Sequence, residues 1–194
     1  VNQLPALQVD KIGTSSKDVE AGKRVYYSFD VTNKGNAVDT FNLVVDISSL
    51  PTGWDASLDQ DKISNLGVDE NITLTDVLVV KAPDDAEAES ETSIIVTISS
   101  DYNSSVNSTY TSRTTVLQNY EPKLSIVGED TMSAKPEEQV NFTIMITNDG
   151  NGDDDISLSL GGNSSWGQLG GSSFILEAGT NDTTTLRVTP PKDT

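Results

Sequence analysis

An internal repeat dominates the sequence, with a constant offset of 115 residues over its best-matched part. In each copy, apolar residues at every second position are followed by the motif Asn-x-Gly-Asn-x-x-Asp and then by a second alternating run. The first copy carries this pattern over residues 25–43, and the second copy carries it over residues 140–158. Because successive strand residues point to opposite faces of a sheet, each copy predicts two half-buried strands joined by a turn.

More short apolar runs follow in the first copy, at residues 72–74, 78–80, 94–98 and 110–117, with Gly, Pro, Asn and Asp between the runs. Short strands at even spacing, separated by turn formers, are typical of antiparallel sandwiches. Residues 84–89 contain helix-forming residues without an apolar stripe, so we expect an acidic turn there. The predicted fold class is therefore all-β, with two tandem immunoglobulin-like antiparallel β-sandwich domains.

The boundary between the domains is expected near Pro122, which favours an extended residue before it and is followed at once by a strand pattern. We therefore predict a first sandwich over residues 1–119 and a second over residues 120–194. The offset falls to 112 between Trp54 and Trp166 and to 108 between Pro83 and Pro191, which indicates shorter loops in the second copy.

The second sandwich is expected to lack its last strands. In the first copy, two strand patterns follow Pro83, at about 92–99 and 109–117, whereas only three residues follow Pro191. One explanation is that the chain continues beyond this piece or was cut there. The other is that the open sheet edge takes a strand from another molecule.

The region from Phe29 to Phe41, followed by Leu50-Pro51-Thr52-Gly53-Trp54, by 74–80 and by Ala82-Pro83, resembles the NEW3 and CARDB-like (cell-adhesion-related) immunoglobulin-like modules. The resemblance covers nearly all of residues 4–117 and the available part of 120–194. The second copy departs from it, with Ser164-Ser165-Trp166 in place of Thr52-Gly53-Trp54. Such modules occur in tandem in secreted and cell-surface proteins of archaea and bacteria. The resemblance implies seven-stranded sandwiches with a spacer, adhesive or accessory-binding role and no catalysis.

Composition excludes several functions. The chain has no Cys and no His, which removes thiolate nucleophiles, Ser-His-Asp triads and the usual zinc sites. Its 30 acidic residues against 12 basic ones give a net charge of −18, so nucleic acid and anionic membrane surfaces are not expected as partners. No apolar run approaches the length that direct membrane insertion requires. Acidic pairs for glycoside hydrolysis do not stand out, so no enzyme is expected.

Six Asn-x-Ser/Thr sequons favour an extracellular, cell-surface setting with N-linked glycans. The glycosylation candidates are Asn71, Asn103, Asn107, Asn141, Asn163 and Asn181. Asn141 should lie on the outward face of its strand, because Val140, Phe142 and Ile144 are expected to point inward. The opening residues have no signal-peptide pattern, so we expect that one was cleaved or that this is an internal fragment.

The most suggestive metal candidate is the acidic turn 148–155, in which Asp149, Asn151, Asp153 and Asp155 alternate like the first ligands of a calcium loop. The full EF-hand pattern fails, since Asp154 stands where Gly is needed and Leu160 stands at the twelfth position. The alternative is a turn in which Asn and Gly supply left-handed backbone and Asp side chains cap amides.

Trp54 and Trp166 occupy corresponding positions and are candidates either for carbohydrate stacking or for packing under a loop. The function that we expect is a non-catalytic structural or adhesive cell-surface module, such as a subunit of a surface layer or filament. Its partners would be other protein domains or further copies joined through β-strand edges. The alternative is a carbohydrate-binding or accessory module of a secreted hydrolase.

Overall fold

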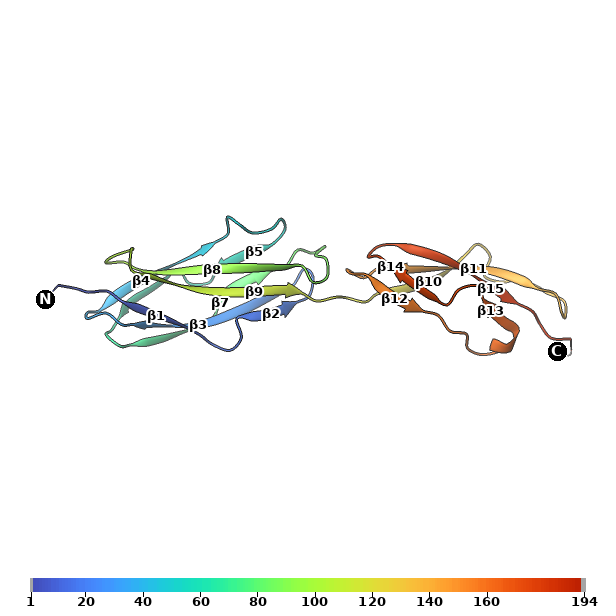
Figure 1. Ribbon diagram of the computed structural model, residues 1–194, viewed down its shortest axis with the longest axis horizontal. Coiled ribbons are helices and arrows are strands. Elements are labelled where there is room, and N and C mark those ends of the chain that lie inside the picture. Colours follow the sequence, from blue (N-terminus) through green and yellow to red (C-terminus); the bar gives the residue numbers. More distant parts are fainter. Residues whose placement is uncertain (1, 193–194) are drawn as a thin grey trace. The chain divides into compact units, whose positions relative to one another are not determined.

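The computed structural model describes residues 2–192, which form an all-β protein with a single short helix, η1 (Ser164–Trp166), in the described part of the chain. The chain divides into two compact units (Figure 1). The first unit ends at Leu117 and the second begins at Gln118, two residues before the boundary expected from the sequence.

The first unit is a sandwich of a four-stranded and a five-stranded sheet (Figure 1). The four-stranded sheet has the order β1 (Leu7–Lys11), β3 (Arg24–Asn33), β7 (Asn71–Lys81) and β5 (Asp55–Leu58). The five-stranded sheet has the order β2 (Ser16–Val19), β9 (Asn107–Val116), β8 (Glu91–Ser100), β4 (Asp39–Asp46) and β6 (Lys62–Leu66). All neighbouring strands are antiparallel except β2 and β9. Because the two sheets face each other with alternating inward side chains, this unit is an immunoglobulin-like sandwich.

Alternate residues of the strands build the core of the first unit, as the sequence pattern predicts. The largest fully buried apolar side chains are Tyr27, Phe29, Val31, Phe41, Ile63, Leu78, Val80, Ile94, Val96, Ile98 and Tyr110. The ring of Tyr110 in β9 stacks on Phe29 in β3, with 4.6 Å between the ring centroids. Strands β8 and β9 therefore contribute directly to this core.

The structure refines two local expectations for the first unit. The runs at residues 72–74 and 78–80 belong to one strand, β7, whose pairing with β3 shifts between Tyr27 and Phe29. At this irregularity Asp76 has a φ of 52° and its backbone N–H donates to Ser28 Oγ at 2.8 Å. Residues 84–89 form turns, as expected, although Ala86 is buried.

Two buried tyrosines give a matched prediction for stability. The Tyr27 hydroxyl contacts Arg113 O and Thr114 Oγ1, each at 2.7 Å, whereas the Tyr110 hydroxyl is buried without a hydrogen-bond partner in the described chain. Because a buried, unpaired polar group is costly, Tyr110→Phe should raise the free energy of unfolding by up to about 1 kcal/mol, while Tyr27→Phe should lower it by about 1–3 kcal/mol. Urea unfolding of both variants measures the difference, and equal effects would contradict the prediction.

Tyr110 also predicts how the stability of the first unit depends on pH. Burial raises the pKa of Tyr110 to about 12 from its ordinary value of 10.0. The pKa of this phenol is higher in the folded state than in the unfolded state, so its contribution to stability is complete below pH 10 and is lost as the pH rises through 12. We therefore expect the Tyr110→Phe variant to lose less stability than the wild type over this alkaline range.

The second unit repeats only part of this plan (Figure 1). Its four-stranded sheet has the order β10 (Pro122–Val127), β11 (Val140–Asn148), β15 (Asn181–Val188) and β13 (Gly167–Leu169), which corresponds to β1, β3, β7 and β5. Its second sheet contains β12 (Asp154–Ser157) and β14 (Ser173–Leu176), which correspond to β4 and β6. Within residues 118–192 there is no counterpart of β8 or β9. The predicted fold class is thus confirmed, including the missing last strands.

The core of the second unit is correspondingly small. Its buried apolar cluster consists of Ile146, Ile156 and Leu176, with Leu158 and Phe174 packed against it. The strand register follows the sequence pattern, because Asn141 is exposed while Val140, Phe142 and Ile144 are partly buried. The apolar face of β11 therefore points inward as expected, but little lies across from it.

Candidate functional site

The first Asn of the repeated motif is buried in both units, and its side chain hydrogen-bonds a turn to a neighbouring strand. Asn33 is completely buried; its Nδ2 donates to Ala37 O at 2.9 Å and to Leu66 O at 2.8 Å, and its Oδ1 accepts from Gly35 N at 2.8 Å. Asn148 makes the same three kinds of bond, to Gly152 O, Leu176 O and Gly150 N, at 2.9, 3.0 and 2.9 Å. Each side chain thus holds a turn against the neighbouring strand of the opposite sheet.

The Gly and second Asn of the motif hold the chain segment that leads into the first strand of each sandwich. Asn36 Oδ1 accepts from Leu4 N at 2.7 Å, and Asn151 Oδ1 accepts from Asn119 N at 2.6 Å. A Cβ atom on Gly150 would lie 2.3 Å from Asn119 O, so only glycine allows this close approach. None of residues 148–155 has a positive φ, so the expected left-handed backbone in this turn is wrong. The turn needs glycine for space.

The predicted calcium residues lie in this same turn and at the start of β12. Asp149 carries an ion pair with Lys123, which also pairs with Glu121, and Asp155 Oδ1 accepts from Ser173 Oγ at 3.3 Å. The hydrogen bonds that Lys123 donates to the carboxylates of Asp149 and Glu121 raise the pKa of Lys123. Among the described residues, no three Asp or Glu side chains gather closely enough to hold a metal ion. Calcium binding at Asp149, Asn151, Asp153 and Asp155 stays a prediction.

The two tryptophans are both partly buried. Trp54 packs against the main core of the first unit and also against a smaller cluster of Val19, Ala82, Ala86 and Val116. Trp166 ends the helix η1, and its carbonyl accepts from Thr189 N at 2.8 Å. The contacts of Trp54 favour packing over a stacking platform. Carbohydrate binding at Trp54 and Trp166 stays a prediction. All six sequon asparagines are exposed, although Asn71 Nδ2 donates to Thr32 Oγ1 at 2.9 Å, and their glycosylation stays a prediction.

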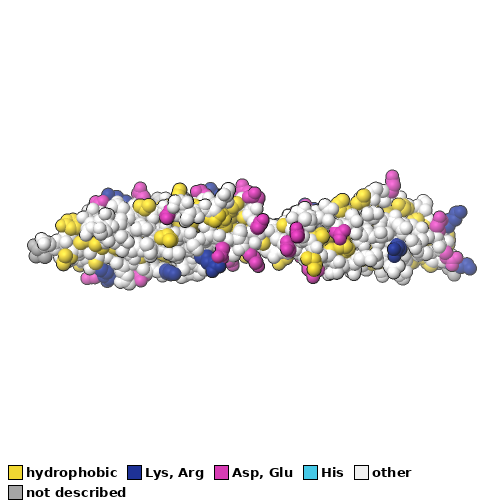
Figure 2. Space-filling model, turned by 45° about the horizontal axis from the view of Figure 1, so that its top comes forward, with side chains coloured by type: hydrophobic (Ala, Val, Ile, Leu, Met, Phe, Trp, Pro, Cys, Tyr) yellow, Lys and Arg dark blue, Asp and Glu magenta, His cyan; other side chains and the backbone are white. Residues whose placement is uncertain are grey.

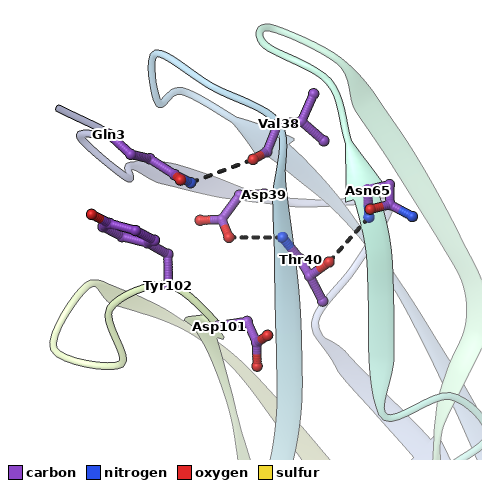
Figure 3. Close-up of a pocket in the computed structure, with 7 residues that line it drawn as sticks. All are labelled: Gln3, Val38, Asp39, Thr40, Asn65, Asp101 and Tyr102. Carbon is purple, nitrogen blue, oxygen red and sulfur yellow. Dashed lines mark hydrogen bonds between the residues drawn. The ribbon is translucent and has the colours of Figure 1, made fainter. Parts of the chain in front are cut away.

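A more exposed aromatic side chain, which the sequence pattern did not single out, borders a hollow at one end of the first unit (Figure 3). Tyr102, 61% exposed, follows β8 and lies beside a hollow of about 460 Å³ that Gln3, Asp39 and Asp101 also line. At its inner side, Asp39 Oδ2 accepts from Ser100 Oγ at 2.6 Å, and both residues are buried. This contact links the first residue of β4 to the last residue of β8 at one end of the five-stranded sheet.

Among the described residues, the second unit has one strand edge, that of β12, whose first-unit counterpart is paired. In the first unit β4 lies between β6 and β8, whereas its counterpart β12 pairs, within residues 2–192, only with β14. Leu158 N donates to Ser172 O on the side of β14, so the alternate residues Asp155 and Ser157 direct their backbone groups to the unpaired side. Their first-unit counterparts, Thr40 and Asn42, face β8, and Thr40 O accepts from Asp101 N at 2.8 Å.

Behind this edge, apolar side chains that are buried in the first unit are partly exposed in the second. Tyr27, Phe29 and Leu43 are buried, and their counterparts Phe142, Ile144 and Leu158 are only partly buried. Leu124 in β10 is 61% exposed. Apolar side chains also appear on the surface view, scattered among acidic and basic ones (Figure 2). An unpaired strand edge beside an uncovered apolar face is the arrangement that accepts an added strand.

Comparison with known proteins assigns no family to this chain. No protein-family model matches the sequence, and the search of curated proteins finds no relative. Similar solved structures include the PapD-like domain 7 of human CEP192 (10% identity, TM-score 0.36, covering 57% of this chain and 83% of that one). Another belongs to a chaperone–tip adhesin complex of CFA/I fimbriae biogenesis (16% identity, TM-score 0.33, covering 96% and 86%). The periplasmic chaperone SfaE is also similar (8% identity, TM-score 0.34, covering 92% and 86%).

The immunoglobulin-like class of the chain rests on the strand order of its own two units. Membership of the NEW3 or CARDB-like modules stays a prediction, because no family model matches the sequence. Within residues 2–192, no helix is long and apolar enough to cross a membrane.

Proposed function

We propose that this chain is a non-catalytic structural or adhesive module of the cell surface, which acts through protein–protein contact at the free edge of β12. The observation that carries the proposal is the pair of sandwiches built on one plan, of which only the first closes its second sheet. An added strand binds such an edge through main-chain hydrogen bonds, and its side chains fill the apolar face behind it. A neighbouring subunit in a surface layer or filament, or sequence outside the second unit, can supply this strand.

The surface chemistry supports an extracellular setting for the same module. The first 119 residues carry 8 basic and 18 acidic side chains, and the remaining 75 carry 4 and 12, so the acidic character belongs to both units. A uniformly acidic surface opposes accidental pairing of strand edges and keeps modules apart at low salt. The exposed sequons are compatible with N-linked glycans. We expect calcium to bind the acidic turn 148–155 at millimolar calcium concentration, the range of extracellular calcium-binding modules.

Carbohydrate binding is the second candidate function, alone or as an accessory module of a secreted hydrolase. One observation favours it: the exposed ring of Tyr102 lies beside carboxylate and amide groups in the hollow of Figure 3. Aromatic faces stack on apolar sugar faces, and carboxylates and amides bind sugar hydroxyls. A glycan array probed with the chain and with Tyr102→Ala separates this candidate from the first.

The test of the main proposal is amide hydrogen exchange on the intact chain, combined with light-scattering mass. We expect the amides of Asp155 and Ser157 to exchange at least about a hundredfold faster than those of Thr40 and Asn42, because only the latter face a paired strand. Ser157→Pro removes one donor from the free edge and leaves the pairing with β14, and Ser157→Ala is its matched control. Slow exchange at β12 in a monomer would contradict the proposal. Runs with millimolar calcium and with chelator show whether the ion changes either readout.

A further inference from the structure

We infer that the free edge of β12 binds a partner β-hairpin whose first strand runs antiparallel to β12 and places a Ser or Thr hydroxyl against Asp154. The same strand presents apolar side chains at alternate positions to the open face of the second unit. This inference rests on the proposed function and specifies the chemistry of the partner. The first unit shows the arrangement, because the hairpin β8–β9 occupies the equivalent place there.

The register of the first unit fixes which partner positions matter. Phe41 pairs with Ser100 and Leu43 pairs with Ile98 across β4 and β8. The 115-residue offset makes Ile156 and Leu158 the counterparts of Phe41 and Leu43. The partner residue opposite Ile156 is therefore the counterpart of Ser100, and the residue opposite Leu158 is the counterpart of Ile98.

The hydroxyl requirement comes from a buried carboxylate. Asp39 is 6% exposed and accepts hydrogen bonds from Ser100 Oγ at 2.6 Å and from Thr40 N at 2.7 Å. Its counterpart Asp154 is already half-buried, and no side-chain donor reaches it within the described residues. A strand added beside β12 would bury this carboxylate further, and a buried carboxylate without a donor is costly. A Ser or Thr at the position of Ser100 removes that cost.

The apolar requirement comes from the uncovered face. In the first unit Ile94, Val96 and Ile98 of β8 are fully buried, and Tyr110 of β9 stacks on Phe29. In the second unit the inward residues Ile144 and Leu158 have no such cover. The first strand of a hairpin covers the side chains next to β12. Its second strand extends the sheet toward β10 and covers the exposed Leu124.

A second copy of the chain is a poor source of this hairpin. Its own β8 and β9 supply core side chains to its first unit, so releasing them would open that sandwich. Each copy also has a net charge of −18, so two copies repel one another at low salt. The partner is therefore a hairpin that is not already part of a closed sandwich.

The experiment supplies the chain's own hairpin as the probe. Residues 84–117 are appended directly after Pro191, because Pro191 corresponds to Pro83 and the first unit continues at this point into β8 and β9. We expect hydrogen exchange at Asp155 and Ser157 to slow by at least about a hundredfold. A matched probe with Ser100→Ala in the appended copy should lose about tenfold or more of this protection, since hydrogen bonds to charged groups are worth that much. A control copy with Ile94, Val96 and Ile98 changed to Thr should give no protection.

The outcomes separate the inference from the proposed function. Equal protection by the Ser100→Ala copy would overturn the hydroxyl requirement and leave strand addition at β12 intact. No protection by any appended copy, in a chain whose first unit stays folded, would overturn both. Protection of β12 in the original chain, appearing only with an oligomeric mass, would make a second copy the occupant and overturn the inference alone.

Discussion

Replacing Asn33 by Ala is expected to lower the free energy of unfolding of the first unit by about 3–6 kcal/mol. The substitution removes three hydrogen bonds at a completely buried site and leaves Gly35 N, Ala37 O and Leu66 O without this partner. Each buried group left unpaired costs about 1–3 kcal/mol, and a typical domain has only about 5–15 kcal/mol of stability. The variant should therefore be near the limit of folding.

Two further variants identify the cause. Asn33→Asp keeps the size of the side chain and its acceptor for Gly35 N, but directs an oxygen at the carbonyls of Ala37 and Leu66. It should be at least as damaging, which excludes a simple cavity effect. Asn107→Ala is the control, because Asn107 is exposed and makes only long local hydrogen bonds of 3.4–3.5 Å. Urea unfolding followed by hydrogen-exchange mass spectrometry of β3 and β7 assigns the loss to the first unit. If Asn33→Ala lowered the free energy of unfolding by less than about 1 kcal/mol, the side-chain hydrogen bonds of Asn33 would contribute little to stability.

The second large effect is expected from identical substitutions at corresponding core positions. Leu78 and Leu186 are related by the repeat, and Leu78 is fully buried whereas Leu186 is partly exposed. Leu78→Ala should destabilise the first unit by about 3–5 kcal/mol, because it removes apolar contacts and leaves a cavity in a closed core. Leu186→Ala should destabilise the second unit by about 1–2 kcal/mol, because less apolar area is buried there.

The comparison also tests whether the second unit is open in solution. Hydrogen exchange in increasing urea gives the free energy of each unit separately, since peptides from β7 and β15 report on different units. Equal losses for the two variants would mean that the second core is as closed as the first. In the extended chain that carries residues 84–117 after Pro191, the cost of Leu186→Ala should rise toward that of Leu78→Ala.

Much of the fold could be predicted because the repeat and the period of two are local properties of the sequence. Alternation at Val140, Phe142 and Ile144 determined which face of β11 points inward, and the register of Asn141 followed from it. The missing β8 and β9 counterparts could be predicted by aligning Pro191 with Pro83. The structural role of the motif could not be predicted, because the pattern suggested only a turn. Asn33 and Asn148 donate hydrogen bonds to strands that lie 33 and 28 residues away in sequence.

The residues of the candidate site were harder to predict from the sequence than the fold was. Trp54 is conspicuous in the chain, yet it packs against the core of the first unit, while Tyr102 is exposed because it lies in the turn after β8. Alternating carboxylates in 148–155 suggested a cation, yet Lys123 pairs with Asp149 from β10. Residue type and spacing cannot show which groups a distant strand brings nearby.

The sequence by itself determined the fold class, the duplication and the incomplete second copy, since these follow from hydrophobic period and residue correspondence. Only the tertiary structure decided that Asp39 is satisfied by Ser100 while Asp154 has no such donor among the described residues. It also decided that, in the same part of the chain, the edge of β12 is unpaired beside an uncovered apolar face. The physical reason is that burial and hydrogen-bond satisfaction depend on which strands are neighbours across the sheet, and in this sandwich those neighbours are far apart along the chain.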